Sequence, residues 1–260
     1  MKLTKTNQLF TSSLLPHGNG KLLDYDNPEN GEKIRYAQFN TRAVIDCPFH
    51  SKGCQAVCYA TKGNHIFPSV IKSREKSFAT SKENDFVDKM IYTISYHMTT
   101  KRYRDAVMLV RIHESGDFYS IQYLKKWIKV WKEIASSGLD VRFVFYTKSF
   151  RFFNMLEETE KEIIRSCMKA GKVSINLSLD DTTTKAQKQA YLAMITNFPL
   201  CNTYYCTENV DAVKHDNVCD CADCAKCGKC NTATATKTVV KIHSASNADM
   251  EEYRKNAEKG

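Results

Sequence analysis

The sequence predicts an α/β fold whose core is a partial or full parallel (β/α) barrel. Two observations predict it: short apolar runs alternate with segments whose apolar residues recur at helical spacing, and polar residues follow the apolar runs repeatedly. Strands that follow one another through a helix are usually parallel neighbours joined by right-handed crossovers. We therefore expect one parallel sheet with its active-site residues at the carboxyl ends of the strands.

The first elements follow from periodicity. Residues 83–100 carry apolar side chains at helical spacing, and residues 106–112 form a compact apolar run suited to a buried strand. A loop at 113–117 precedes a helix over 120–137, whose apolar stripe includes Trp127 and Trp131 and which ends at Gly138. We expect both tryptophans in the core.

The same alternation continues toward the C-terminus. Strands are predicted at 141–146, 172–179 and 202–206, with helices at 152–169 and 183–194 between them. Residues 232–236 read as a linker and 238–243 as a late strand.

Composition divides the chain into four parts. Residues 1–45, rich in Gly, Asn, Pro and Asp, predict an irregular lead-in, and 46–200 form the α/β core with a first cysteine cluster. Residues 201–243 form a cysteine-rich, metal-binding segment, and 244–260 a charged, helix-prone tail that we expect to be solvated.

The first cysteine cluster comprises Cys47, Cys54 and Cys58, on a loop containing proline and glycine. Structural zinc normally takes four ligands, whereas a 4Fe-4S cluster held by three thiolates leaves one iron open to a small molecule. The spacing favours an iron–sulfur cluster. Zinc completed by His50, or unliganded thiols, remain alternatives.

The second cluster lies between Cys201 and Cys230. Cys221, Cys224 and Cys227 are each separated by two residues, the spacing with which a ferredoxin loop holds its cluster, and Cys206 or Cys230 supplies a fourth ligand. This pattern predicts a second metal centre, iron–sulfur or zinc. Cys167, outside both groups, lies in a helical pattern and is expected to be a buried structural thiol.

Polar residues at the ends of the predicted strands are the second candidate site. They are Arg111, His113, Glu114 and Asp117, then Thr147, Lys148 and Ser149, then Asn176, Ser178 and Asp180. They can bind and position a ligand, or they can form a buried ion-pair network that only closes the end of the sheet.

The formal net charge of +9 favours polyanionic partners, a nucleic acid or nucleotide, although a basic surface that serves only solubility explains the charge equally well. Apolar runs fall far short of the roughly 20 residues of a membrane-spanning helix, so no membrane is expected. The first residues lack the apolar block of a secretory signal. We therefore expect a reducing cytoplasm, where thiols persist.

Several motifs stand out along residues 14–230. They are His17-Gly18-Asn19-Gly20-Lys21-Leu22, Phe39-Asn40, Cys47-Pro48, Cys54, Cys58-Tyr59-Ala60-Thr61-Lys62-Gly63, Arg111-Ile112-His113-Glu114-Ser115-Gly116-Asp117-Phe118, Tyr146-Thr147-Lys148-Ser149 and the terminal Cys-x-x-Cys repeats. Together they resemble the bacteriophage gene product eighty-eight family, and this resemblance implies a location in the cytoplasm of an infected bacterial host.

That family is distantly similar to radical S-adenosylmethionine enzymes, which build a partial α/β barrel, hold one cluster with three N-terminal cysteines and often carry auxiliary clusters. The resemblance implies S-adenosylmethionine as a cofactor, a reductant as a partner, and a seat near Tyr59 for adenine. It implies catalytic roles for His113, Glu114, Asp117 and Lys148, and cofactor contacts by Arg111, Ser149, Asn176, Ser178 and Asp180. The cysteine spacing departs from the usual Cys-x3-Cys-x2-Cys of those enzymes.

Two other function classes fit the sequence. A non-catalytic module can use its metal centres to stabilise its fold while it binds nucleic acid or a host protein. An electron-relay protein needs only the two centres.

Overall fold

The computed structural model describes residues 14–17, 24–28, 30–219, 227–242 and 245–258. Its strands are β1 (Tyr25–Asp26), β2 (Lys33–Phe39), β3 (Val107–Ile112), β4 (Val141–Thr147), β5 (Val173–Asp180), β6 (Asn202–Thr207), β7 (Asn217–Cys219) and β8 (Lys237–Lys241). The α-helices are α2 (Lys52–Ala56), α3 (Pro68–Lys82), α4 (Phe86–Thr99), α5 (Ile121–Ser136), α6 (Phe150–Asn154), α7 (Glu158–Lys169), α8 (Lys185–Asn197) and α10 (Asn247–Ala257). Short 3-10 helices are η1 (Tyr59–Thr61), η2 (Gly63–Ile66), η3 (Val210–Ala212) and η4 (Lys229–Asn231).

The eight strands form one sheet in the order β1-β2-β3-β4-β5-β6-β8-β7, and every pairing is parallel except that of β1 with β2. The predicted α/β class and parallel core are confirmed. Closure into a barrel is not confirmed, because the described strands leave β1 and β7 as the two edges. Within the described part of the chain, none of the helices has the length and apolar character that a bilayer crossing requires.

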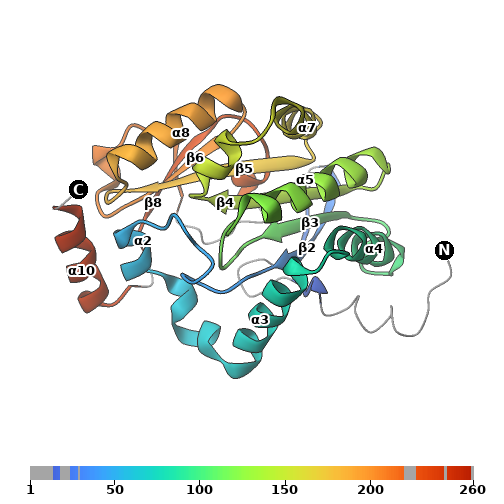
Figure 1. The fold of residues 1–260 in the computed structure, drawn as a ribbon, viewed down its shortest axis with the longest axis horizontal. Helices are drawn as coiled ribbons and strands as arrows, with labels where there is room; N and C mark the ends of the chain where they lie inside the picture. The colour runs from blue at the N-terminus through green and yellow to red at the C-terminus, as the bar shows by residue number, and fades with distance from the viewer. Residues whose placement is uncertain (1–13, 18–23, 29, 220–226, 243–244, 259–260) are drawn as a thin grey trace.

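One face of the sheet carries the main hydrophobic core. Side chains of successive residues point to opposite faces of a strand, so Met108, Val110 and Ile112 of β3 share one face. They pack with the apolar stripe of α5, including Trp127 and Trp131, which are both fully buried as predicted. Figure 1 shows α4, α5, α7 and α8 arranged along this side of the sheet.

The opposite face holds a much smaller apolar cluster of Tyr36, Leu109 and Val144. Arg111, Tyr146, Asn176, Ser178, Asp180, Tyr204 and Cys206 fall at the same alternate positions of their strands. Since the described residues form only this small apolar cluster here, the rest of the face is available for polar chemistry.

Three expectations are corrected. Residues 33–39 of the expected irregular lead-in form β2, which pairs with β3 over six residues from Ile34 to Phe39. The helix expected at 152–169 is two helices, α6 and α7, with Leu156 buried between them. The tail expected to be solvated forms α10, which lies beside α2 (Figure 1) and buries Tyr253 to 1% exposure.

Candidate functional site: a cysteine-lined cavity at the strand ends

A cavity of about 280 Å³ lies at the carboxyl ends of β3, β4, β5, β6 and β8. Its lining contains the three cysteines of the first cluster, Cys47, Cys54 and Cys58, together with Cys206. The predicted site residues Tyr59, Arg111, His113, Glu114, Asp117, Lys148, Ser178 and Asp180 line the same cavity. Two groups of residues selected independently in the sequence therefore meet in one place.

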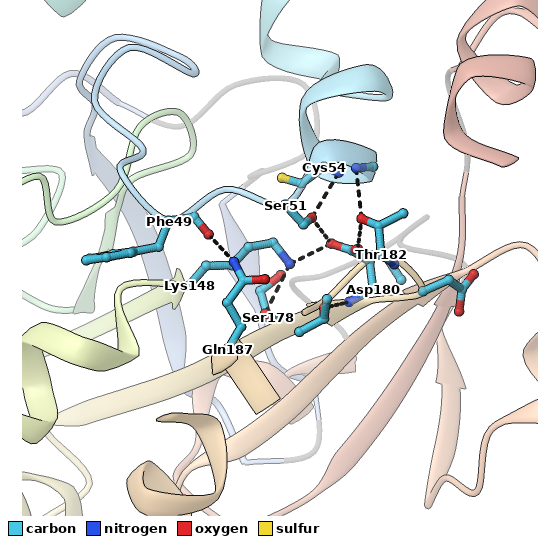
Figure 2. Close-up of polar contacts among 12 residues, drawn as sticks. Phe49, Ser51, Cys54, Lys148, Ser178, Asp180, Thr182 and Gln187 are labelled. Carbon is cyan, nitrogen blue, oxygen red and sulfur yellow. Dashed lines mark hydrogen bonds and ion pairs between the residues drawn. The ribbon is translucent and has the colours of Figure 1, made fainter. Parts of the chain in front are cut away.

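The loop that carries the first cysteines is anchored on Asp180, at the end of β5 (Figure 2). Ser51 caps α2 by accepting a hydrogen bond from the backbone N–H of Cys54 at 3.1 Å, and its hydroxyl donates to Asp180. The second Asp180 oxygen accepts from the Thr182 hydroxyl at 2.6 Å, and Thr182 in turn accepts from the Gly53 N–H at 2.8 Å. Because α2 has only five residues, these contacts, not helix propensity, hold Cys54 in place.

Lys148 and Asp180 form a buried ion pair beside Cys54. Lys148 Nζ lies 2.8 Å from the Asp180 carboxylate and 3.1 Å from the Ser178 carbonyl oxygen, and the two side chains are 8% and 3% exposed. Burial acts to raise the pKa of Asp180, but the Lys148 ammonium and the hydrogen bonds to the carboxylate leave it below its usual value. Lys148 is therefore charged and already partnered.

Loop 113–117 is tied to the segment that leads into the first cysteines. The Asn40 side chain accepts from the backbone N–H of Glu114 at 2.7 Å, and Thr41 N–H donates to the Ser115 carbonyl at 3.0 Å. The Tyr59 hydroxyl donates to the carbonyl oxygen of Glu114, which brings the residue after Cys58 to the end of β3.

Asp117 is a positioning group. One of its carboxylate oxygens accepts from the Thr147 hydroxyl and the other from the Lys148 N–H, at 2.7 and 2.8 Å. Burial raises the pKa of Asp117, while these hydrogen bonds oppose the shift. The carboxyl links the end of β3 to the end of β4 and borders the cavity.

His113 is strained and neutral. Its φ of +62° lies in the left-handed region, which costs energy for a residue with a Cβ. Its Nε2 shares a hydrogen bond of 2.9 Å with the Tyr123 hydroxyl, whereas its buried Nδ1 has no partner among the described residues. Burial lowers the pKa of His113 to about 3, so the ring is uncharged at neutral pH.

Burial favours the protonated form of the thiols of the first cluster. Burial raises the pKa of Cys54 to about 11, with Lys148 acting in the opposite direction, and burial also raises the pKa of Cys47 and Cys58. A metal that binds them must displace these protons.

A second, smaller pocket lies on the same sheet face. Cys219, Cys227 and Cys230 line it, together with Arg111, Tyr146 and Tyr204, which also line the first cavity. The Arg111 guanidinium lies 4.7 Å from the centre of the Tyr146 ring, and the rings of Tyr146 and Tyr204 pack edge to face at 4.8 Å. A layer of three side chains thus separates the two cysteine groups.

The structure places some predicted residues elsewhere. Cys206 lines the first cavity and not the second pocket, where the second cluster was expected to use it. Asn176 donates to the carbonyl oxygens of Phe145 and Cys230, which places it beside the second pocket. Ser149 is fully buried and donates to the Phe118 carbonyl, outside both linings. Cys221 and Cys224 lie outside the described residues.

Other cavity residues were not predicted. Tyr146 and Tyr204 share a face with Arg111 and Ser178, so strand alternation could have found them. Tyr253 could not have been found, because it arrives from the C-terminal helix. Arg74 of α3 is also unpredicted: it donates to the carbonyl oxygens of Ala60 and His65 and so holds the loop after Cys58.

His50 is the residue expected to complete a zinc site at the first cluster. Nδ1 of His50 faces the Cys47 carbonyl oxygen at 2.5 Å and Nε2 faces the Gln55 side chain at 3.1 Å, so both ring nitrogens are engaged. Among the residues that the structure describes, no three His, Cys, Asp or Glu side chains are grouped to hold a single metal ion.

The fold and the site together define a parallel α/β protein with a cysteine-lined cavity at the carboxyl ends of its strands. The chain belongs to the Gene product 88 family, whose sequence model matches residues 8–233. This match confirms the family resemblance drawn from the sequence motifs. Comparison with curated proteins and with solved structures found no match.

Proposed function

We propose that this protein is an iron–sulfur enzyme that uses S-adenosylmethionine in radical chemistry. The observation that carries the proposal is the shared cavity: three thiols from one short loop border the same space as the polar strand ends. An electron relay or a binding module would not need a cavity of about 280 Å³ lined by polar side chains beside its cysteines.

Three thiolates are the ligand number of a 4Fe-4S cluster with one open iron, whereas a structural zinc ion normally takes four ligands. Cys47, Cys54 and Cys58 would hold the cluster. When bound, such a cluster offers an open iron to the amino and carboxylate groups of S-adenosylmethionine and supplies the electron for its cleavage.

The remaining lining residues would bind and orient the ligand. Tyr59, Tyr146 and Tyr204 offer ring faces or edges for the adenine, and Arg111 and Glu114 offer charge to the methionine and ribose groups. His113, neutral and with an unengaged Nδ1 in the described part of the chain, can donate or accept one hydrogen bond without changing the charge of the site.

The second cysteine group would hold an auxiliary cluster. Cys230 is held against β5, where Ser174 and Asn176 both donate to its carbonyl oxygen at 2.8 and 3.0 Å. The layer of Arg111, Tyr146 and Tyr204 would then lie between the two centres.

Anaerobic purification followed by metal analysis tests the first part of the proposal. We expect a brown protein with broad absorbance at about 400 nm and matching iron and sulfide content. Replacing Cys54 by serine should reduce the iron content, whereas replacing Cys167, which is buried in α7 away from both linings, should not. A colourless protein with stoichiometric zinc would contradict an iron–sulfur function.

Product analysis tests the second part. With dithionite as reductant, S-adenosylmethionine should yield methionine and deoxyadenosine, and Cys54→Ser should abolish the yield. An iron-loaded protein that neither binds nor cleaves S-adenosylmethionine would leave the electron relay as the better function.

A further inference from the structure

The C-terminal helix α10 contacts the ends of several strands around the first cavity. Tyr253 packs its ring against Gly53 of α2: a Cβ added at Gly53 would stand 2.6 Å from Tyr253 Cε2. The Tyr253 hydroxyl accepts from the Asp181 N–H at 3.1 Å and lies 3.0 Å from the Asp181 carboxylate. One side chain therefore joins the helix of Cys54 to the turn after β5.

Two ion pairs place α10 in the same position. Asp249 pairs with Lys62, which follows η1 and the third cysteine, and Arg254 pairs with Glu208 just beyond β6. Asp249 also caps the first turn of α10 together with Ser246. The helix thus bridges the cysteine loop and the strand ends from outside residues 8–233, the part that matches the family.

The packing of α2 depends on this bridge. Its five residues are too few for an independent helix, and it is held between Asp180 and Thr182 on one side and Tyr253 on the other. Gly53 leaves no space for movement toward either partner, since a Cβ at this residue would lie only 2.7 and 2.8 Å from side-chain atoms of Thr182. Because Cys54 directly follows Gly53 in the chain, the contacts that fix Gly53 also fix the position of Cys54.

We propose that Tyr253 is a positioning residue for Cys54, and that α10 is the clamp that keeps this thiol directed into the cavity. The clamp works in the metal-free protein. Only its importance for metal binding rests on the proposed function, in which Cys54 is a cluster ligand.

Alkylation of the metal-free full-length protein tests the proposal, with the rate at each cysteine followed by mass spectrometry. Tyr253→Ala should raise the alkylation rate of Cys54 by about tenfold, because losing the ring lets α2 open locally. Tyr253→Phe keeps the ring and should remain close to the wild type. Lys255→Ala, an exposed residue of the same helix, is the matched control and should not change the rate.

Buried Cys167 and Cys201 serve as internal references for global unfolding. If they become reactive in Tyr253→Ala, that variant has lost its global fold. Tyr253→Leu, which conserves more apolar volume, then replaces it as the test and should expose Cys54 selectively. An unchanged Cys54 rate in a folded Tyr253 variant would overturn the clamp. Since no iron is present, this result is independent of whether the protein binds a cluster.

In the iron-loaded protein, the same variants provide a second readout. Tyr253→Ala should change the electron paramagnetic resonance spectrum of the reduced protein, and Tyr253→Phe should restore it. An identical spectrum in all three proteins would show that the ring does not position the ligand.

Discussion

Asp180 joins three parts of the site: its own strand end, Lys148 at the end of β4, and the loop of the first cysteines. Its carboxylate accepts hydrogen bonds from Lys148, Ser51 and Thr182, so it is a fully partnered charge. In sequence it is one of several polar residues after apolar runs. Through these contacts Asp180 holds the loop of the first cysteines against the ends of β4 and β5.

Asp180→Asn should lower the free energy of unfolding by about 3 to 5 kcal/mol, because it leaves the Lys148 ammonium buried without its counter-charge. The double variant Lys148→Met/Asp180→Asn removes both charges and should lose less. Urea denaturation measures both. Equal losses in the two variants would show that the ion pair is not what the single change disrupts.

The burial of His113 predicts that the free energy of unfolding depends on pH. The folded protein keeps this ring neutral down to about pH 3, whereas in the unfolded chain it takes up a proton near its ordinary pKa of 6.5. Between these values the unfolded state binds more protons, so the stability associated with His113 falls as the pH falls.

Between pH 7 and pH 5 the wild type should therefore lose about 2 kcal/mol more stability than His113→Gln, which does not titrate. Denaturation curves at the two pH values measure the difference. Parallel losses in both proteins would show that His113 takes up its proton over the same pH range in the folded and the unfolded states.

At the scale of elements, loop 113–117 is shaped by close backbone contact. Gly116 has a φ of +86°, and a Cβ there would overlap the Thr41 hydroxyl oxygen. The contact brings the β3 loop against the segment before Cys47, and it requires a residue without a side chain.

Gly116→Ala should destabilise the protein more than Gly171→Ala. Gly171 has a similar φ of +68° but open space around it in the described part of the chain, so its replacement costs only the backbone strain of about 1 to 2 kcal/mol. The clash at Gly116 should add about 1 to 3 kcal/mol. Thermal unfolding of both variants gives the comparison, and equal shifts would mean that Thr41 moves aside freely.

In the whole molecule, the pockets of the two cysteine groups lie on the same sheet face, and Arg111, Tyr146 and Tyr204 line both of them. The opposite face is used by the main core and its helices. The residues that form the main core and the residues that line the two pockets therefore lie on opposite faces of the same strands.

Because the two groups line separate pockets, the two proposed metal centres should load independently. Replacing Cys47, Cys54 and Cys58 together by serine should remove one centre and keep the other, and replacing Cys227 and Cys230 should do the reverse. Iron content and the absorbance spectrum of each variant measure this. Complete loss of iron in either variant would indicate one shared centre.

Most strands and helices of the core were predictable, because burying one face leaves a regular apolar spacing such as that of Trp127 and Trp131. The break between α6 and α7 was not, since apolar residues continue through Met155 and Leu156. Strand β2 was also missed. Its residues include charged Lys33 and Arg35, and its place is set by pairing with β3 and not by its own pattern.

The α/β class, the cysteine groups and the polar strand ends could be predicted from the residues alone, because periodicity and residue spacing are local properties. Chain packing was needed to show that Cys206 lines the first cavity, that Asn176 lies beside the second pocket, and that Tyr253 reaches the first cavity from the C-terminal helix. These relations join residues far apart in the chain. They depend on which strands pair and how helices pack across them, which no local pattern records.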